Sequence, residues 1–179
     1  DALPIWDKIF LATKVGGLEQ YPGLSEDNVR AALDNSLERL QTDRVDLYYA
    51  HYDDETQSAQ QLARTFHGLV EDGKIRHIGI SNLSPQRQNA WIAAAKEEGL
   101  TIPSAIQPNY SLAHRNDYEG PDGYGVVAEQ NNLAVFPYFS LAAGLLTGKY
   151  RKLDDFNDVP REGMLKQYAD ETGLHLVEA

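Results

Sequence analysis

Residues 43–81 read DRVDLYYAHYDDETQSAQQLARTFHGLVEDGKIRHIGIS, and this stretch decides the fold class. Its ends, residues 43–51 and 74–81, are short apolar runs that close on polar residues, which is typical of buried β-strands. Between them, a helix is predicted over residues 59–71, and Gly73 suits the position after its C-terminus. The apolar residues of that helix lie on one side: Leu62, Phe66, Leu69 and Val70. This order predicts two parallel strands joined by a crossover helix.

The same alternation extends through the rest of the chain, which we expect to form one domain over residues 1–179. Further strands are predicted at residues 8–14, 104–107 and 133–139, and further helices at residues 26–40, 85–99 and 124–130. The helix starts have suitable caps in Ser25 and in the pair Ser84 and Pro85. The pattern therefore predicts an α/β protein with parallel strands.

Periodicity leaves two architectures open, a closed (β/α)8 TIM barrel and an open doubly wound sheet. No G-x-G-x-x-G turn follows any predicted strand, although a dinucleotide-binding open sheet would carry one. Polar residues stand at the C-terminal ends of successive strands, where barrels assemble their active sites. They are Lys14, His51, Ser81, Asn82, Gln107 and Tyr138. Both observations favour the barrel.

Composition limits the classes of function. The formal net charge of -11 argues against nucleic acid as the main partner. The chain has no cysteine, which excludes disulfides and thiolate metal sites and fits a cytoplasmic location. There is no run of about 18 apolar residues, so we expect no membrane-spanning helix. Histidine and carboxylate spacing indicates no metal site.

Five segments together carry a resemblance to a known family. They are FLATKVGG (10–17), RLQTDRVDLYYAHYDD (39–54), LVEDGKIRHIGISNLS (69–84), AIQPNYSL (105–112) and PYFSLAAGLLTGKY (137–150). Their order and spacing resemble those of aldo-keto reductases, and above all the branch that contains bacterial reductases and potassium-channel β subunits. The resemblance covers almost the whole chain. It implies an incomplete TIM barrel of about strands 3 to 7, the cofactor NADP(H) with NAD(H) as the alternative, and a small-molecule carbonyl substrate.

Two residues match catalytic positions of this family. Lys14 ends a strand that is predicted to be buried, where a lysine would need an anionic partner. Most strand-end lysines simply extend into solvent. The resemblance implies that Lys14 lies beside a catalytic tyrosine and favours its phenolate form. His51 ends LYYAH and, taken alone, is more simply a hydrogen-bonded residue at the rim. The resemblance implies that its imidazole donates a hydrogen bond to the substrate carbonyl.

Ser81, Asn82 and Gln107 match positions that hold the cofactor's nicotinamide carboxamide in the family. Asn and Gln supply both the donor and the acceptor that a carboxamide needs. The competing interpretation is a side-chain turn that ends the strand.

The segment after residue 137 resembles the family's pyrophosphate loop. Tyr138 matches an aromatic residue that stacks on the nicotinamide, although a tyrosine is more often a core or surface residue. The resemblance implies backbone or phosphate contacts for six further residues: Phe139, Ser140, Leu141, Ala142, Gly144 and Lys149. Phe139 and Ser140 replace the Ser and Pro that are common in relatives. The basic run that begins at Lys149 has a competing interpretation as a solvated charged turn. Residues 152–171 have the composition of a long loop.

The family's catalytic Asp and Tyr belong to motifs upstream of Phe10, and residues 1–9 resemble neither. A protein limited to these residues would therefore be predicted to have no turnover. Three functions stay open: an NADPH-preferring reductase of aldehydes or ketones, a cofactor-binding regulatory subunit with little turnover, and an unrelated isomerase or aldolase that uses Lys14 as a Schiff-base amine. Substrate identity and the oligomeric state are not predicted.

Overall fold

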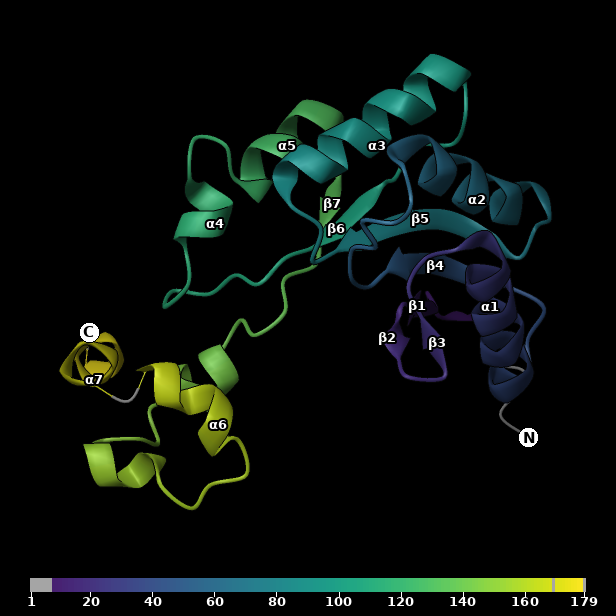
Figure 1. Ribbon diagram of the computed structural model, residues 1–179. Helices are drawn as coiled ribbons and strands as arrows, with labels where there is room; N and C mark the ends of the chain where they lie inside the picture. Colours follow the sequence, from purple (N-terminus) through teal and green to yellow (C-terminus); the bar gives the residue numbers. More distant parts are fainter. Residues whose placement is uncertain (1–7, 169, 179) are drawn as a thin grey trace. The chain divides into compact units, whose positions relative to one another are not determined.

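The computed structural model describes residues 8–168 and 170–178, and its internal contacts divide the chain into two compact units (Figure 1). The first unit comprises residues 1–107 and 127–136. The second comprises residues 108–126 and 137–179. Each unit is described by itself.

The first unit contains a five-stranded parallel sheet in the order β1-β4-β5-β6-β7. The strands are β1 (Ala12–Val15), β4 (Val45–Ala50), β5 (Ile75–Ser81), β6 (Ala105–Gln107) and β7 (Ala134–Val135). Each strand of this sheet pairs with the one that precedes it in the sheet and in the chain, whereas a doubly wound sheet reverses direction at a switch point. The α/β prediction is confirmed, and the sequential order is that of a (β/α)8 barrel.

Helices α1 (Glu26–Leu40), α2 (Ala59–Glu71) and α3 (Pro85–Glu98) lie along one face of this sheet (Figure 1). The caps predicted for α3 are confirmed, because the Ser84 side chain accepts a hydrogen bond from the Arg87 backbone N–H and Gly99 ends the helix in the left-handed conformation. Ser25 is the N-cap residue of α1, as predicted, and its side chain makes no capping hydrogen bond.

The two faces of the sheet differ in what covers them. On the helix-covered face, Tyr48 is fully buried, and its ring lies 5.9 Å from that of Phe66 in α2. Ile78, Ile80 and Ile106 are fully buried in the same unit. On the opposite face, Leu47, Tyr49 and Ala105 form a small cluster of their own. This second face carries the polar strand ends described below.

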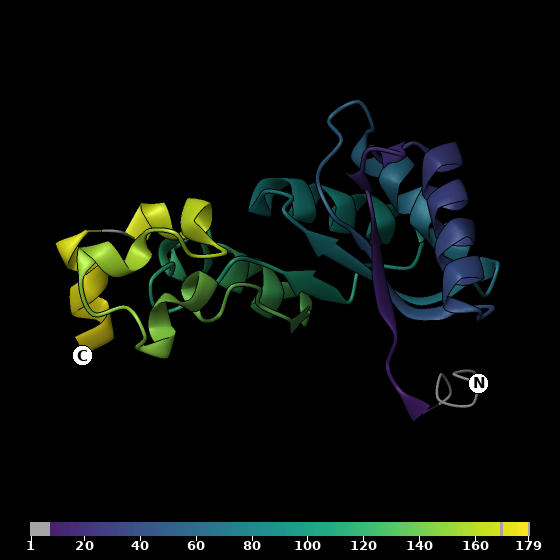
Figure 2. The ribbon, with the colours of Figure 1, turned by 90° about the horizontal axis from the view of Figure 1, so that it is seen from below.

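Two strands differ from the expectation. The strand predicted at residues 8–14 begins at Ala12, and only Val15 in it is buried, because β1 is an edge strand with one neighbour in the part of the chain described (Figure 2). The strand predicted at residues 133–139 is reduced to β7. Pro108 of the neighbouring segment has no N–H to donate, so regular pairing ends there, although Phe136 still donates to Ile106 and Tyr138 to Pro108. A short hairpin of β2 (Gly17–Leu18) and β3 (Tyr21–Pro22) follows β1 and was not predicted.

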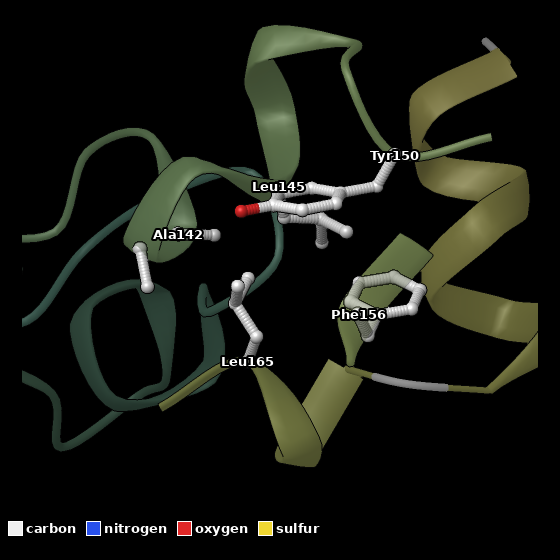
Figure 3. Packing of buried hydrophobic residues seen from close by; sticks show 6 residues of the cluster. Ala142, Leu145, Tyr150, Phe156 and Leu165 are labelled. Carbon is white, nitrogen blue, oxygen red and sulfur yellow. The ribbon is translucent and has the colours of Figure 1, made fainter. Parts of the chain in front are cut away.

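The second unit is built from short helical turns around a small core. Its elements are α4 (Asn116–Glu119), the start of α5 (Tyr124–Asn131), η2 (Ala142–Thr147), η3 (Leu153–Phe156), α6 (Glu162–Leu165), η4 (Lys166–Tyr168) and α7 (Glu171–Glu178). The core contains Ala142, Leu145 and Leu165 with the stacked rings of Tyr150 and Phe156, whose centroids are 5.1 Å apart (Figure 3). Residues 152–171, expected to be a loop, thus contain several helical turns.

Candidate functional site

The strand register brings four of the predicted residues to one end and one face of the sheet. Lys14 pairs with Tyr49, two residues before His51, and Ser81 pairs with Gln107. Tyr49 in turn pairs with Gly79, two residues before Ser81. Side chains that are paired across strands, or two residues apart along one strand, share a face. Lys14, His51, Ser81 and Gln107 therefore share the face opposite the helices.

Lys14 is exposed at the edge of the sheet and contacts an aromatic ring. Its Nζ lies 5.5 Å from the centroid of the Tyr49 ring, a cation–π distance. Burial of Tyr49 raises the pKa of its hydroxyl to about 12, so the ring is neutral. The ring lies across Gly79, where a Cβ would overlap it. Among residues 8–168 and 170–178, no carboxylate forms the ion pair expected for Lys14, whose side chain is exposed.

His51 lies between two loops at the end of β4. Its backbone N–H donates to the carbonyl of Val15 at 2.9 Å, and its ring stacks on Tyr52 at 4.3 Å between centroids. Gly17 packs against Nδ1, so a Cβ there would overlap the imidazole. Burial, and then the charge of Lys14, lower the pKa of His51. Near neutral pH the imidazole is therefore neutral, and it keeps one N–H that can donate to a carbonyl oxygen.

Ser81 and Asn82 tie neighbouring strand ends together. The Ser81 hydroxyl, which is almost fully buried, donates to the backbone carbonyl of Gln107 at 2.9 Å. The Asn82 side-chain amide donates to the carbonyl of His51 at 2.9 Å and to the Ser81 hydroxyl at 3.0 Å. These bonds join neighbouring strand ends and are not a local side-chain turn. The contact of Ser81, Asn82 and Gln107 with a carboxamide stays a prediction.

In the second unit, the predicted pyrophosphate loop has an unusual backbone. Positive φ angles occur at Phe139 (54°), Ala142 (48°), Ala143 (56°) and Gly144 (107°). Left-handed conformations cost energy in non-glycine residues and cluster at ligand-binding sites. Two of the expected donors are used within the loop, because the N–H groups of Ala142 and Gly144 donate to the carbonyls of Phe139 and Leu141 at 2.6 and 2.9 Å. Backbone contacts of this loop with a pyrophosphate stay a prediction.

The aromatic residue at the start of this loop contacts its neighbour. The ring of Tyr138 meets that of Phe139 edge-to-face at 5.2 Å, and its backbone N–H donates to Pro108 at 2.9 Å. Both contacts orient the Tyr138 ring, and its stacking on a nicotinamide stays a prediction.

A cavity of about 270 Å³ lies beside the loop in the second unit. Its lining residues are Leu141, Ala143, Gly144, Thr147, Lys149, Tyr150, Pro160 and Arg161. Two cationic side chains and no carboxylate line it, although the chain as a whole is strongly acidic. This donor set fits an anionic group such as a phosphate. Arg161 was missed because it lies in the stretch that was read as a loop, and its chemical type was the only available signal.

Among residues 8–168 and 170–178, no group of three or more His, Asp or Glu side chains lies close enough together to hold a metal ion. None of the helices described has the length and apolar character to cross a membrane.

Comparison with known proteins finds one family. A sequence model described as "Aldo/keto reductase family" matches residues 5–177. The chain is 31% identical to an "Aldo-keto reductase" of Babesia bovis, over 83% of this chain and 63% of that protein. It is 31% identical to "L-glyceraldehyde 3-phosphate reductase" of Escherichia coli (strain K12), over 89% of this chain and 45% of that protein. It is 35% identical to "Aldo-keto reductase yakc [NADP(+)]" of Schizosaccharomyces pombe, over 83% and 44% respectively. The chain thus spans about half the length of these curated relatives.

Proposed function

The chain belongs to the aldo/keto reductase family, and on that premise we propose that the protein is an NAD(P)H-dependent oxidoreductase that reduces aldehydes or ketones to alcohols. The observation that carries the proposal is the placement of Lys14 and His51 on one face at the ends of adjacent parallel strands. Active sites of barrels are assembled at this end of the strands. We also propose that residues 1–179 are part of one barrel domain that acts in the cytoplasm.

In this proposal, His51 acts on the substrate oxygen. A neutral imidazole N–H donates to the carbonyl oxygen and stabilises the negative charge that develops on it during reduction. The lowered pKa of His51 suits this role, because the imidazole is already neutral near neutral pH and donates through its one N–H. Lys14 would supply a positive charge that favours the ionised form of the family's catalytic tyrosine, which is the proposed proton donor to the substrate oxygen. Tyr49, whose pKa is raised to about 12, does not take this role.

The remaining candidate residues are proposed to bind the cofactor. In the first unit, Asn82 and Gln107 would orient the nicotinamide carboxamide, and Ser81 would hold Gln107 in place. In the second unit, Lys149 and the loop at Gly144 would hold phosphate groups in the cationic cavity. The bound nicotinamide would supply the hydride. NADP(H) is the preferred form in this proposal, and the name of the Schizosaccharomyces pombe relative, which includes NADP(+), supports this choice.

Two measurements on the full-length protein test the proposal. Titration with NADPH, followed by protein fluorescence, should show saturable binding. Addition of an aldehyde should then cause loss of the reduced-nicotinamide absorbance. Failure to bind any nicotinamide cofactor would contradict the proposal. Tight binding with negligible turnover that His51→Ala does not reduce would instead favour a regulatory subunit. Borohydride trapping of substrate on Lys14 would indicate a Schiff-base enzyme.

A further inference from the structure

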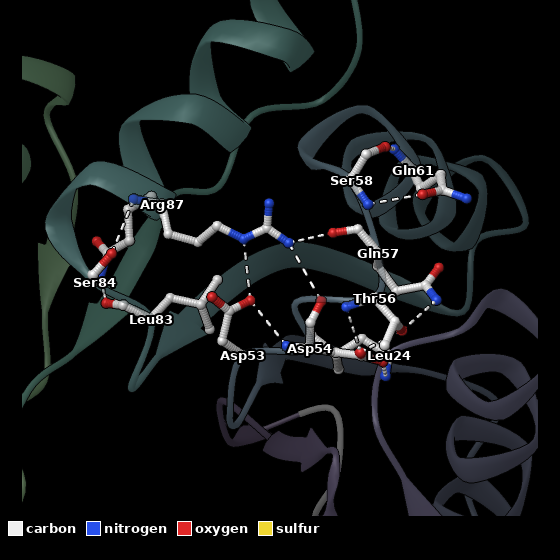
Figure 4. Close-up of polar contacts among 11 residues, drawn as sticks. Leu24, Asp53, Asp54, Thr56, Gln57, Ser58, Gln61, Leu83, Ser84 and Arg87 are labelled. Carbon is white, nitrogen blue, oxygen red and sulfur yellow. Dashed lines mark hydrogen bonds and ion pairs between the residues drawn. The ribbon is translucent and has the colours of Figure 1, made fainter.

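A network of polar contacts joins the loop after β4 to the first turn of α3 (Figure 4). The Arg87 guanidinium donates from Nε to Asp53 Oδ1 at 3.1 Å and from Nη2 to the carbonyl of Asp54 at 3.4 Å. Nη2 also donates to the carbonyl of Gln57. The side chains of Arg87 and Asp53 are only 20% and 24% exposed, so this ion pair is partly shielded from water. We call these four residues the Arg87 network.

Asp54 extends the network to the loop that follows β1. Its Oδ2 accepts the backbone N–H of Leu24 at 2.7 Å, and its Oδ1 accepts from the backbone and hydroxyl of Thr56 at 3.1 and 2.5 Å. The Leu24 and Thr56 hydrogen bonds hold the pKa of Asp54 below its ordinary value, so the carboxylate is charged at neutral pH. Gly23 fits tightly beside it, since a Cβ there would lie 2.6 Å from Oδ2.

The loop after β4 and the loop after β1, which the hydrogen bond from Leu24 to Asp54 joins, provide the two walls of the His51 imidazole. One wall is the Tyr52 ring, which stacks on the imidazole directly before Asp53 in the chain. The other is Gly17 in the hairpin, which packs against Nδ1. The hairpin returns through Pro22, bridged to Gly16, to Leu24. Movement of either loop would therefore change the space in which the imidazole lies.

We propose that the Arg87 network positions His51 by holding together the two loops that carry the walls of its imidazole. Arg87, Asp53 and Asp54 are positioning residues in this proposal and need not touch substrate or cofactor. The kinetic consequence rests on the proposed function, whereas the effect on His51 itself does not. Misplacement of a reacting group by about 1 Å can cost about 100-fold in rate.

The chain offers a matched control in another arginine that links α3 to a neighbouring element. Arg64 of α2 makes a bidentate ion pair with Glu98 at the C-terminal end of α3, with distances of 2.6 and 2.8 Å. Like Arg87 it joins two elements through a guanidinium, but its partner lies at the far end of the helix from Ser84. Arg64→Gln therefore shows how much kcat and the Kd for NADPH change when an arginine link to α3 is lost away from His51.

The test uses Arg87→Gln and Asp54→Asn in the full-length protein, with Arg87→Lys as the conservative variant. We expect Arg87→Gln and Asp54→Asn to lower kcat about 10- to 100-fold, with the Kd for NADPH unchanged. Arg87→Lys keeps the charge and should recover part of the loss. Arg64→Gln should leave both constants unchanged. Equal loss in Arg64→Gln, or wild-type kcat in Arg87→Gln, would overturn the proposal.

A pH titration of the His51 ring by NMR distinguishes a change in the packing around the imidazole from a direct electrostatic effect on it. The measurement does not depend on enzyme activity. Lys14 and Tyr52 are the titratable groups that face the imidazole. Loosening the walls should expose the ring and raise its pKa toward the ordinary value of about 6.5 in both variants. A direct charge effect would instead move the pKa in opposite directions, because one variant removes a cation and the other an anion. Opposite shifts, or none, would overturn the proposal.

Two further outcomes are distinguishable. If the wild-type protein neither binds NADPH nor turns over, the proposed function fails, while the NMR titration still decides the role of the Arg87 network. If Arg87→Gln does not fold, Asp53→Asn removes only the Asp53 charge and leaves both carbonyl contacts of Arg87. An unchanged His51 pKa in Asp53→Asn and Asp54→Asn would then overturn the proposal.

Discussion

The strand ends of the first unit and the loop of residues 139–161 in the second unit hold their candidate residues by different means. In the first unit, Lys14 and His51 follow regular strands, and their positions come from strand register and close packing. In the second unit, four consecutive or near-consecutive residues adopt positive φ angles beside a cavity lined by Lys149 and Arg161. In the first region, close packing places the candidate residues. In the second region, the distinguishing feature is the positive charge of the cavity lining.

This difference matches the two tasks proposed for these regions. Hydrogen bonding to a reacting oxygen depends steeply on distance and angle, so it needs a rigid support. The attraction between a cation and a phosphate falls off slowly with distance, so a loop is sufficient. We therefore expect changes in the first region to act mainly on kcat and changes of charge in the second region to act mainly on the Kd for the cofactor.

The largest effect is expected from His51→Ala, which removes the proposed donor to the substrate oxygen. In the full-length protein kcat should fall about 100- to 1,000-fold, as for loss of one oxyanion donor, with the Kd for NADPH unchanged. Steady-state kinetics and a fluorescence titration check this. His77→Ala, which removes an exposed histidine of β5, is the control and should leave kcat and the Kd for NADPH unchanged. Full kcat in His51→Ala would favour a regulatory subunit.

The second largest effect is expected from Gly17→Ala, which adds one methyl group where it would overlap His51 Nδ1. The imidazole must move, and kcat should fall about 10- to 100-fold. Gly163→Ala is the matched control in the other unit, because a Cβ there meets nothing within 4 Å. Equal kcat values for the two variants would show that the His51 pocket is not sensitive to shape.

A smaller effect is expected from Lys149→Met, which removes one cation from the cavity of the second unit. The Kd for NADPH should rise about tenfold, equivalent to about 1.5 kcal/mol for one charge-assisted hydrogen bond, and kcat should change little. The same substitution at Lys152, which does not line the cavity, is the control. A drop in kcat without a change in Kd would contradict the assignment of this loop to phosphate binding.

The smallest effect is a change in the pH dependence of stability, and it is expected from a charge change in the first unit. Lys14→Met removes the lesser of the two causes that lower the pKa of His51, so that pKa should rise but stay below its ordinary value. In the wild type the folded state binds fewer protons at His51 than the unfolded chain does. The free energy of unfolding should therefore fall as the pH drops through about 6.5 toward the lower folded value. The fall should be smaller in Lys14→Met, as NMR titration and urea unfolding at several pH values can show.

Much of the fold was predictable because its signals are local. Helix α3 begins at Ser84 and Pro85 and ends at Gly99, and each of these residues has a conformational reason to stand there. The sheet order followed from the alternation of strands and helices. Exposure of β1 was not predictable, since an apolar strand is buried only if neighbours cover both its edges and its faces.

The candidate site was predictable only where residues follow a strand. Lys14, His51, Ser81 and Gln107 could be found at strand ends, and the resemblance named their roles. The Arg87 network could not, because its contacts join residues 30 or more positions apart, such as Asp54 to Leu24 and Arg87 to Asp53. No local pattern encodes such pairs. Arg161 was missed for a similar reason, since it acquires a role only through the cavity beside Lys149.

The ring of Tyr49 lies flat over Gly79 and beneath the ammonium group of Lys14. The Tyr49 ring therefore contacts both neighbouring strands, because it fills the space beside Gly79 in β5 and supports the ammonium group of Lys14 from β1. A survey of random variants would place Gly79 among the positions least tolerant of replacement, although it offers no functional group. Such a position could be mistaken for a catalytic one, although its only contribution is the space that its missing side chain leaves for the Tyr49 ring.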